Sequence, residues 1–387
     1  MRYQIIRNCR IAGQDDDTAR DILIINNKIV HIGEHLLPPS IDTEVYDANG
    51  KYALPTSVDT SSSFGALDID SLDDLATDCL TSGITTWLAD EVTTSIPSEM
   101  KRSASLASFL ANYGFHFRLE GLRYFDSSKV ESTALTYGIT TAYAKLSTAA
   151  PTRFDRFDQY LELAQRHGLT IVFDIVDNGN TDEHMYAFST FAEKLTAEFV
   201  GKIIFTNVRY DEEMKILANL RQHIDVYAGL TFDPLSNDLS SLSEFTAASV
   251  VAHLRYNDWC YATARTNCDT AEYRKFVTHN RLPIIAAMPD GDPLTPKELA
   301  EMTSTRQCCI FDLAPEKGRI AIGADADICI WDNSAVHQEI ISLPNGRARN
   351  VKLCGQIDAV FLNGQLAFST DGGNGKTEGM PVYRRVI

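Results

Sequence analysis

Few residues in this chain stand in patterns that could do chemistry. The sequence contains no G-x-S-x-G turn, no Gly-rich phosphate loop and no H-E-x-x-H pair. Its nine histidines are scattered singly, mostly in predicted helices and loops, where we expect ordinary structural or surface roles. His116 falls on a predicted strand of the central region, and it is therefore the histidine to inspect in the structure.

One loop and three arginines are weaker candidates. The run Asp177-Asn-Gly-Asn-Thr-Asp-Glu-His184 gathers oxygen-bearing side chains after a predicted strand. It lacks the full calcium-loop pattern, so a solvated loop is the favoured interpretation. Arg209, Arg255 and Arg265 could make one end of the central region basic and able to hold a small anion, although surface salt bridges explain them more simply.

Composition indicates a globular chain with an acidic surface. Its 387 residues suffice for a large domain and a smaller one, and 44% hydrophobic with 22% charged residues is ordinary. The net charge of −17 argues against nucleic acid or an anionic membrane as a partner.

Nothing in the sequence suggests secretion or a membrane. The eight cysteines show neither a C-x-x-C pair nor zinc spacing, so we expect reduced, mostly buried thiols. No apolar run approaches the roughly 18 residues of a membrane span. The N-terminus alternates like a strand and lacks the apolar core of a signal peptide, which predicts a cytoplasmic protein.

Strand-like and helix-like segments alternate between residues 55 and 310. Such alternation predicts a parallel sheet covered by helices. A (β/α)₈ barrel and a doubly wound open sheet both satisfy this pattern. Residues 1–54 and 311–387 contain short strands and hairpins that cannot close a core separately, so we expect them to form one domain together.

A resemblance to a known family decides between these folds. Gly50, Lys51, Pro55, Asp59 and Phe64 match the first barrel strand of the cyclic amidohydrolases, the dihydroorotases and hydantoinases of the amidohydrolase superfamily.

The family's closing motif, G-x-I-x-x-G-x-x-A-D-x-x-x-x-D, resembles residues 318–332. The resemblance implies a (β/α)₈ TIM barrel over residues 55–310. It also implies a composite β-sandwich domain built from residues 1–54 and 311–387.

The same resemblance locates the positions at which the family carries its metal ligands and catalytic group. In chain order these positions are Ser61, Ser63, Lys145, Phe173, Asn207 and Ala264. The family has histidines at four of them, a carboxylated lysine at the third and a catalytic aspartate at the last. A register shift of one residue would place Asp174 and Thr206 there instead of Phe173 and Asn207.

Only Lys145 keeps the residue type of the family. Neutral hydroxyl groups are poor ligands for zinc, phenyl groups cannot coordinate it, and an alanine cannot take a proton from water. We therefore expect no metal cofactor and no confident catalytic residue. Without metals, Lys145 should be a free amine, half-buried and paired with Asp59 or Asp174.

The resemblance then implies a dihydroorotase-like pseudo-enzyme with a structural or binding role. Non-catalytic members of the family associate with aspartate transcarbamoylase in pyrimidine biosynthesis, and others form homo-oligomers, so both are candidate partners. The alternative is an active cyclic amidohydrolase of dihydroorotase or hydantoinase type, with a rebuilt site that could use zinc. Metal content distinguishes the two hypotheses.

Overall fold

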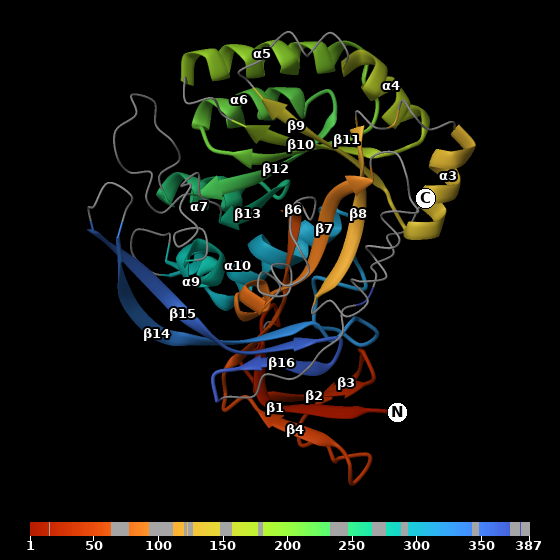
Figure 1. The fold of residues 1–387 in the computed structure, drawn as a ribbon. Coiled ribbons are helices and arrows are strands. Elements are labelled where there is room, and N and C mark those ends of the chain that lie inside the picture. Colours follow the sequence, from red (N-terminus) through yellow and green to blue (C-terminus); the bar gives the residue numbers. More distant parts are fainter. Residues whose placement is uncertain are drawn as a thin grey trace.

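The computed structural model describes residues 1–14, 16–62, 77–92, 111–119, 122, 127–147, 157–176, 181–232, 247–264, 276–287, 293–342, 348–371 and 380. Within this part of the chain the strands form two eight-stranded sheets (Figure 1). One is parallel and comes from the middle of the chain, and the other joins both ends. No helix in the described ranges combines the length and the apolarity needed to cross a membrane.

The parallel sheet is the barrel predicted from the alternation and the family resemblance. Its strands lie side by side in sequence order: β6 (Ser57–Ser62), β7 (Ile84–Val92), β8 (Asn112–Arg118), β9 (Thr141–Ser147), β10 (Thr170–Val176), β11 (Lys202–Val208), β12 (Asp225–Phe232) and β13 (Cys260–Ala264).

Helices follow these strands and cover the outside of the sheet (Figure 1). They are α3 (Ser127–Tyr137), α4 (Phe157–Arg166), α5 (Thr181–Glu198), α6 (Asp211–Leu220) and α7 (Ala247–Tyr256). Apolar side chains on both faces of the strands explain the arrangement, because a parallel sheet must be buried on both sides. The predicted (β/α)₈ fold is confirmed.

Short helices complete the barrel after its last strand. These are α9 (Arg281–Ala286), α10 (Pro296–Ala300), the π-helix η4 (Glu301–Thr305) and α11 (Arg306–Ile310). No ladder between β13 and β6 occurs in the described ranges, and η4 and α11 contact both strands at this seam. Phe311 and Leu313, which follow α11, pack inside the barrel, so the predicted domain boundary at residue 311 falls within this plug.

The second sheet confirms a composite domain from both termini. Its order is β16-β15-β14-β5-β1-β2-β3, with β4 also paired to β1. The strands are β1 (Tyr3–Ile11), β2 (Arg20–Ile25), β3 (Lys28–Gly33), β4 (Glu44–Asp47), β5 (Tyr52–Pro55), β14 (Ile328–Ser342), β15 (Ala348–Leu362) and β16 (Gln365–Ser369).

Strand β1 belongs to both halves of this sheet. Its first half pairs with β2 and β4, and its second half pairs with β5. The register shifts between Ile6 and Cys9, where Asn8 has a φ of 53°, a conformation that asparagine tolerates. The two halves therefore share one apolar core, to which Ile22 and Phe361 contribute from opposite ends of the chain.

A buried carboxylate, Asp327, joins the composite sheet to the barrel. Its Oδ2 accepts from the Lys317 ammonium and from Asn112 Nδ2 at 3.0 Å, and its Oδ1 accepts from the Asn363 backbone N–H at 2.8 Å. Burial alone would lower the pKa of Lys317, but Asp327 and Asp325 outweigh it and raise that pKa. Asp327 is the aspartate of the motif's A-D pair, so this motif connects the domains.

Removing the charge of Asp327 should destabilise the whole chain. The variant Asp327→Asn leaves a buried ammonium with only one of its two carboxylate partners, and we expect unfolding to become easier by about 3–5 kcal/mol. Asp332→Asn, at a partly exposed position of β14, should cost about 1 kcal/mol or less. Urea denaturation measures both, and equal losses would contradict the role assigned to Asp327.

Candidate functional site

Alternation along the barrel strands decides which side chains reach the interior. Val58, Tyr143, Val172, Ile204 and Tyr261 come from five strands and still share one cluster, which is possible only inside the barrel. Residues two positions further along each strand point the same way, toward the carboxyl ends of the strands. Barrels of this kind carry their sites at that end.

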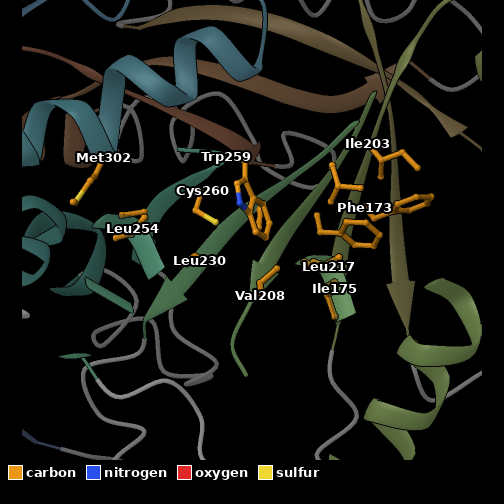
Figure 2. Packing of buried hydrophobic residues seen from close by; sticks show 14 of the residues in the cluster. Phe173, Ile175, Ile203, Val208, Leu217, Leu230, Leu254, Trp259, Cys260 and Met302 are labelled. Atoms are coloured by element: carbon orange, nitrogen blue, oxygen red, sulfur yellow. The ribbon is translucent and has the colours of Figure 1, made fainter. Parts of the chain in front are cut away.

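Phe173 lies on the opposite face. Its ring packs against Phe191 of α5, with centroids 4.9 Å apart, and against Phe205 of β11 at 5.6 Å. Figure 2 shows Phe173 in this apolar layer, together with Ile203 and Leu217. The prediction that Phe173 occupies a metal-ligand position is therefore wrong, because the phenyl group faces the helices.

Asp174 is the residue that β10 directs into the barrel. It shares the face of Val172, and its side chain is 5% exposed. Tyr143 donates its phenolic proton to Asp174 Oδ2 at 2.7 Å, and the Thr206 hydroxyl lies 3.3 Å from both Asp174 Oδ1 and the Phe173 carbonyl oxygen, which share its one proton. The one-residue register shift considered from the sequence is thus realised, with a carboxylate held by two neutral hydroxyls.

The neighbouring strand β11 shows the same shift. Thr206, the register partner of Asp174, faces the interior, whereas Asn207 has a φ of 68° at a bulge. The Asn207 amide donates to the Ile175 carbonyl at 2.6 Å, and its oxygen accepts from Arg209 Nη2 at 2.9 Å. Asn207 therefore joins two strand ends, and Thr206 is the residue that β11 directs into the interior.

Lys145 lies on the interior face of β9 beside Asp174, its register partner. Its side chain is exposed, and among the described residues it forms no ion pair, so the predicted half-buried pairing is wrong. Val58 faces the interior, so Asp59, the next residue of β6, faces the helices. There it lies near Cys79: burial raises the pKa of the Cys79 thiol, and the Asp59 carboxylate adds to that rise. Asp59 is therefore on the wrong face to meet Lys145.

The remaining predicted positions lie at the ends of β6 and β13. Ser61 belongs to β6, and Ser63 falls outside the described residues. Ala264 is the last residue of β13, but Thr263 shares the interior face of Tyr261. The Thr263 hydroxyl lies 2.9 Å from that of Thr231.

His116 is a satisfied interior histidine. Its Nε2 lies 3.2 Å from the Thr60 carbonyl oxygen, which can only accept, so Nε2 carries the proton. Its Nδ1 then accepts from the Thr141 hydroxyl, and the ring stacks on Tyr143 at 5.7 Å. Both ring nitrogens are engaged, so His116 cannot serve as a metal ligand without breaking these contacts.

The basic residues at the barrel mouth differ from those predicted. Arg255 forms a surface salt bridge with Glu298 at 2.8 Å, and Arg265 lies outside the described residues. Arg209 is engaged with Asn207. Arg118, which sequence reasoning missed, ends β8 in register with Tyr143 and is exposed on the interior face, next to the strand of Lys145.

A second feature missed from the sequence is the buried pair of His184 and Glu213. Their side chains meet at 2.6 Å between α5 and α6, and each is 1% exposed. The other Glu213 oxygen accepts from the backbone N–H groups of Arg209 and Tyr210 at 2.7 and 3.0 Å, which caps α6. His184 thus belongs to α5 and not to a calcium-type loop.

These donors do not fit the zinc centre implied by the resemblance. Zinc in proteins takes imidazole, thiolate or carboxylate ligands. The described interior strand ends supply one carboxylate, Asp174, with hydroxyls at Thr206 and Thr263, and sequence positions 61 and 63 are serines. No group of three or more His, Cys, Asp or Glu side chains in the described residues could hold a metal.

Solved structures share this architecture. A D-hydantoinase (dihydropyrimidinase) from Thermus sp. superposes with a TM-score of 0.74 at 16% identity, covering 98% of this chain and 100% of that one. A dihydropyrimidinase from Brevibacillus agri gives 0.69 at 17%, covering 99% and 98%. The chain has the hydantoinase fold. At this identity the likeness concerns the fold alone.

Sequence comparison finds one long match at low identity and short matches at higher identity. Protein unc-33 of Caenorhabditis elegans is 24% identical over 455 residues, covering 99% of this chain and 51% of unc-33, so the chain spans about half of that relative. A rat dihydropyrimidinase is 62% identical, but over 34 residues, 9% of this chain and 7% of that protein. No model of a protein family matches the chain.

The hydroxyl contact to Asp174 should matter for stability, whereas Lys145 should not. Tyr143→Phe removes a hydrogen bond to a buried carboxylate, and we expect a loss of about 1.5–3 kcal/mol. Lys145→Gln changes an exposed side chain that forms no ion pair with the described residues, and its effect should stay within about 0.5 kcal/mol. Chemical denaturation compares the two, and an equally large loss for Lys145→Gln would support its predicted pairing.

The pair of His184 and Glu213 should couple α5 to α6. Glu213→Ala removes the buried carboxylate that accepts from two backbone N–H groups and meets the imidazole, which should cost about 3–5 kcal/mol. A double-mutant cycle with His184→Ala should give a coupling of about 0.5–3 kcal/mol. Lys215→Ala, on the exposed side of α6, is the matched control; zero coupling would contradict the assignment.

Proposed function

We propose that this chain is a non-catalytic member of the amidohydrolase superfamily, close to the dihydroorotases and hydantoinases, with a binding or assembly role. One observation carries the proposal. The interior strand ends present Asp174, Thr206 and Thr263, together with the amine of Lys145, where the resemblance expects histidines and a catalytic aspartate.

This set of side chains is poorly suited to opening a cyclic amide. Hydrolysis needs an activated water, which comes either from a metal or from a well-placed general base. The hydroxyls of Thr206 and Thr263 are neither metal ligands of zinc type nor bases near neutral pH. Asp174 already accepts two hydrogen bonds within the protein, which reduces its availability as a base.

A specific observation favours the alternative, a rebuilt active site. Asp174 and Lys145 are register partners on adjacent strands and share the interior face, with Lys145 exposed to solvent. A carboxylate beside an ammonium at the mouth of a barrel could take a proton and stabilise a developing oxyanion. Under this alternative the chain would be an active cyclic amidohydrolase, and the chemistry would rest on these two residues.

The assembly role has two candidate partners. One is a second copy of the chain, and the other is an enzyme of the aspartate transcarbamoylase type, which would place the protein in pyrimidine biosynthesis. The net charge of −17 disfavours nucleic acid in either case. The support for the transcarbamoylase partner is the dihydroorotase-like sequence motifs, and co-purification from cell extract would test it.

Turnover assays separate the proposal from the alternative. The full chain, supplied with zinc, should open neither dihydroorotate nor hydantoin above the uncatalysed rate. Turnover that disappears in Asp174→Asn and in Lys145→Gln, but survives in the surface control Lys215→Ala, would establish the rebuilt hydrolase and contradict the proposal. Circular dichroism of each variant verifies that the fold is retained.

A further inference from the structure

Strands β14 and β15 form a ribbon that reaches past the rest of their sheet (Figure 1). β5 pairs with β14 only over residues 328–331 of β14. β16, residues 365–369, pairs with β15 only over residues 359–362 of β15. Beyond this point the ladder with β15 is interrupted at residues 333–335 and resumes over residues 336–342, and no other described strand pairs with the second side of that segment.

This open edge has only part of the usual protection, a bulge at its start and one charged residue, Glu339. Natural proteins guard free strand edges with lysine, proline or other charged residues, because an exposed apolar edge recruits further strands. Residues 333–342 contain no lysine, arginine or proline. Two large apolar side chains stand out from the edge segment, Val336 with 62% exposure and Ile340 with 76%. The opposite strand of the ribbon does carry charges, Arg349 and Lys352.

The side chains on this edge are ordered symmetrically around Gln338. When two copies pair antiparallel with Gln338 opposite Gln338, Val336 lies opposite Ile340 of the second copy, and His337 lies opposite Glu339. Each contact occurs twice because the axis is twofold. Apolar pairs and pairs of an imidazole with a carboxylate are among the cross-strand pairs that stabilise antiparallel sheets.

The polar pair is accessible for such a contact. The side chains of His337 and Glu339 are 40% and 46% exposed, and within one chain they lie 3.8 Å apart. Gln338 is held in place by Asn350, whose amide donates to it at 2.8 Å. The edge is therefore already extended and partly ordered before a partner arrives, which lowers the entropic cost of adding a strand.

We infer that residues 336–342 of β14 are a dimerisation edge, and that its occupant is a second copy of this chain. A twofold interface requires a surface that is complementary to itself, and the order Val-His-Gln-Glu-Ile satisfies this requirement. The inference rests on the assembly role proposed above and assigns to it a surface and a partner.

Sedimentation of the full chain across micromolar concentrations tests the inference. The unmodified chain should form a dimer. Ile340→Lys removes the apolar pair and His337→Glu opposes two carboxylates, each twice per dimer, so either should weaken self-association about tenfold or more. Combining His337→Glu with Glu339→Lys restores opposite charges and should recover much of the affinity. Val200→Lys, at a residue with 75% exposure on the barrel, should change nothing.

Two outcomes would contradict the assignment of a dimerisation edge. One is a monomer at all concentrations, and the other is a dimer that neither edge variant weakens. The second outcome would leave the assembly role intact, and the turnover assays test the non-catalytic role separately, so the two failures can be told apart. If Ile340→Lys fails to fold, the single variant His337→Glu and the double variant with Glu339→Lys still test the dimerisation edge, since both positions are partly exposed.

Discussion

Because successive side chains of a β-strand point to opposite faces, each barrel strand can give the interior only every second residue. The consequence is largest in β10, where Phe173 faces the helices and Asp174 faces the interior. A shift of one residue would exchange a phenyl for a carboxylate. The same rule sends Phe205 outward and Thr206 inward on the next strand, so it determines what kind of chemistry the barrel mouth can offer.

The barrel depends on sequence far from its strands. The α11 helix and the residues after it fill the end opposite the site, and Phe311 packs within 5.9 Å of the Tyr261 ring centroid. Asp327 then connects the start of β8 to the composite sheet through Asn112. The closing motif is therefore structural. It acts at the end of the barrel away from the strand ends that carry the candidate site.

Much of the fold was predictable, because the alternation of segments and the two motifs agree on it. The site was less so, for a physical reason. The run Thr-Ile-Val-Phe-Asp-Ile-Val of β10 is apolar on both faces, so its periodicity does not tell which residue points inward. In β11 the bulge at Asn207 changes the direction of the chain locally. The pair of His184 and Glu213 depends on packing between two helices, which sequence spacing does not reveal.

Within the part of the chain that the structure describes, the barrel mouth lacks the donors of a metal-dependent hydrolase, and zinc content tests this most directly. The full chain would be produced in zinc-replete medium, purified without chelators and measured by plasma mass spectrometry. We expect zinc far below stoichiometric amounts, at the same level as in the variant Asp174→Asn. About one or two zinc ions per chain, reduced in Asp174→Asn, would contradict it.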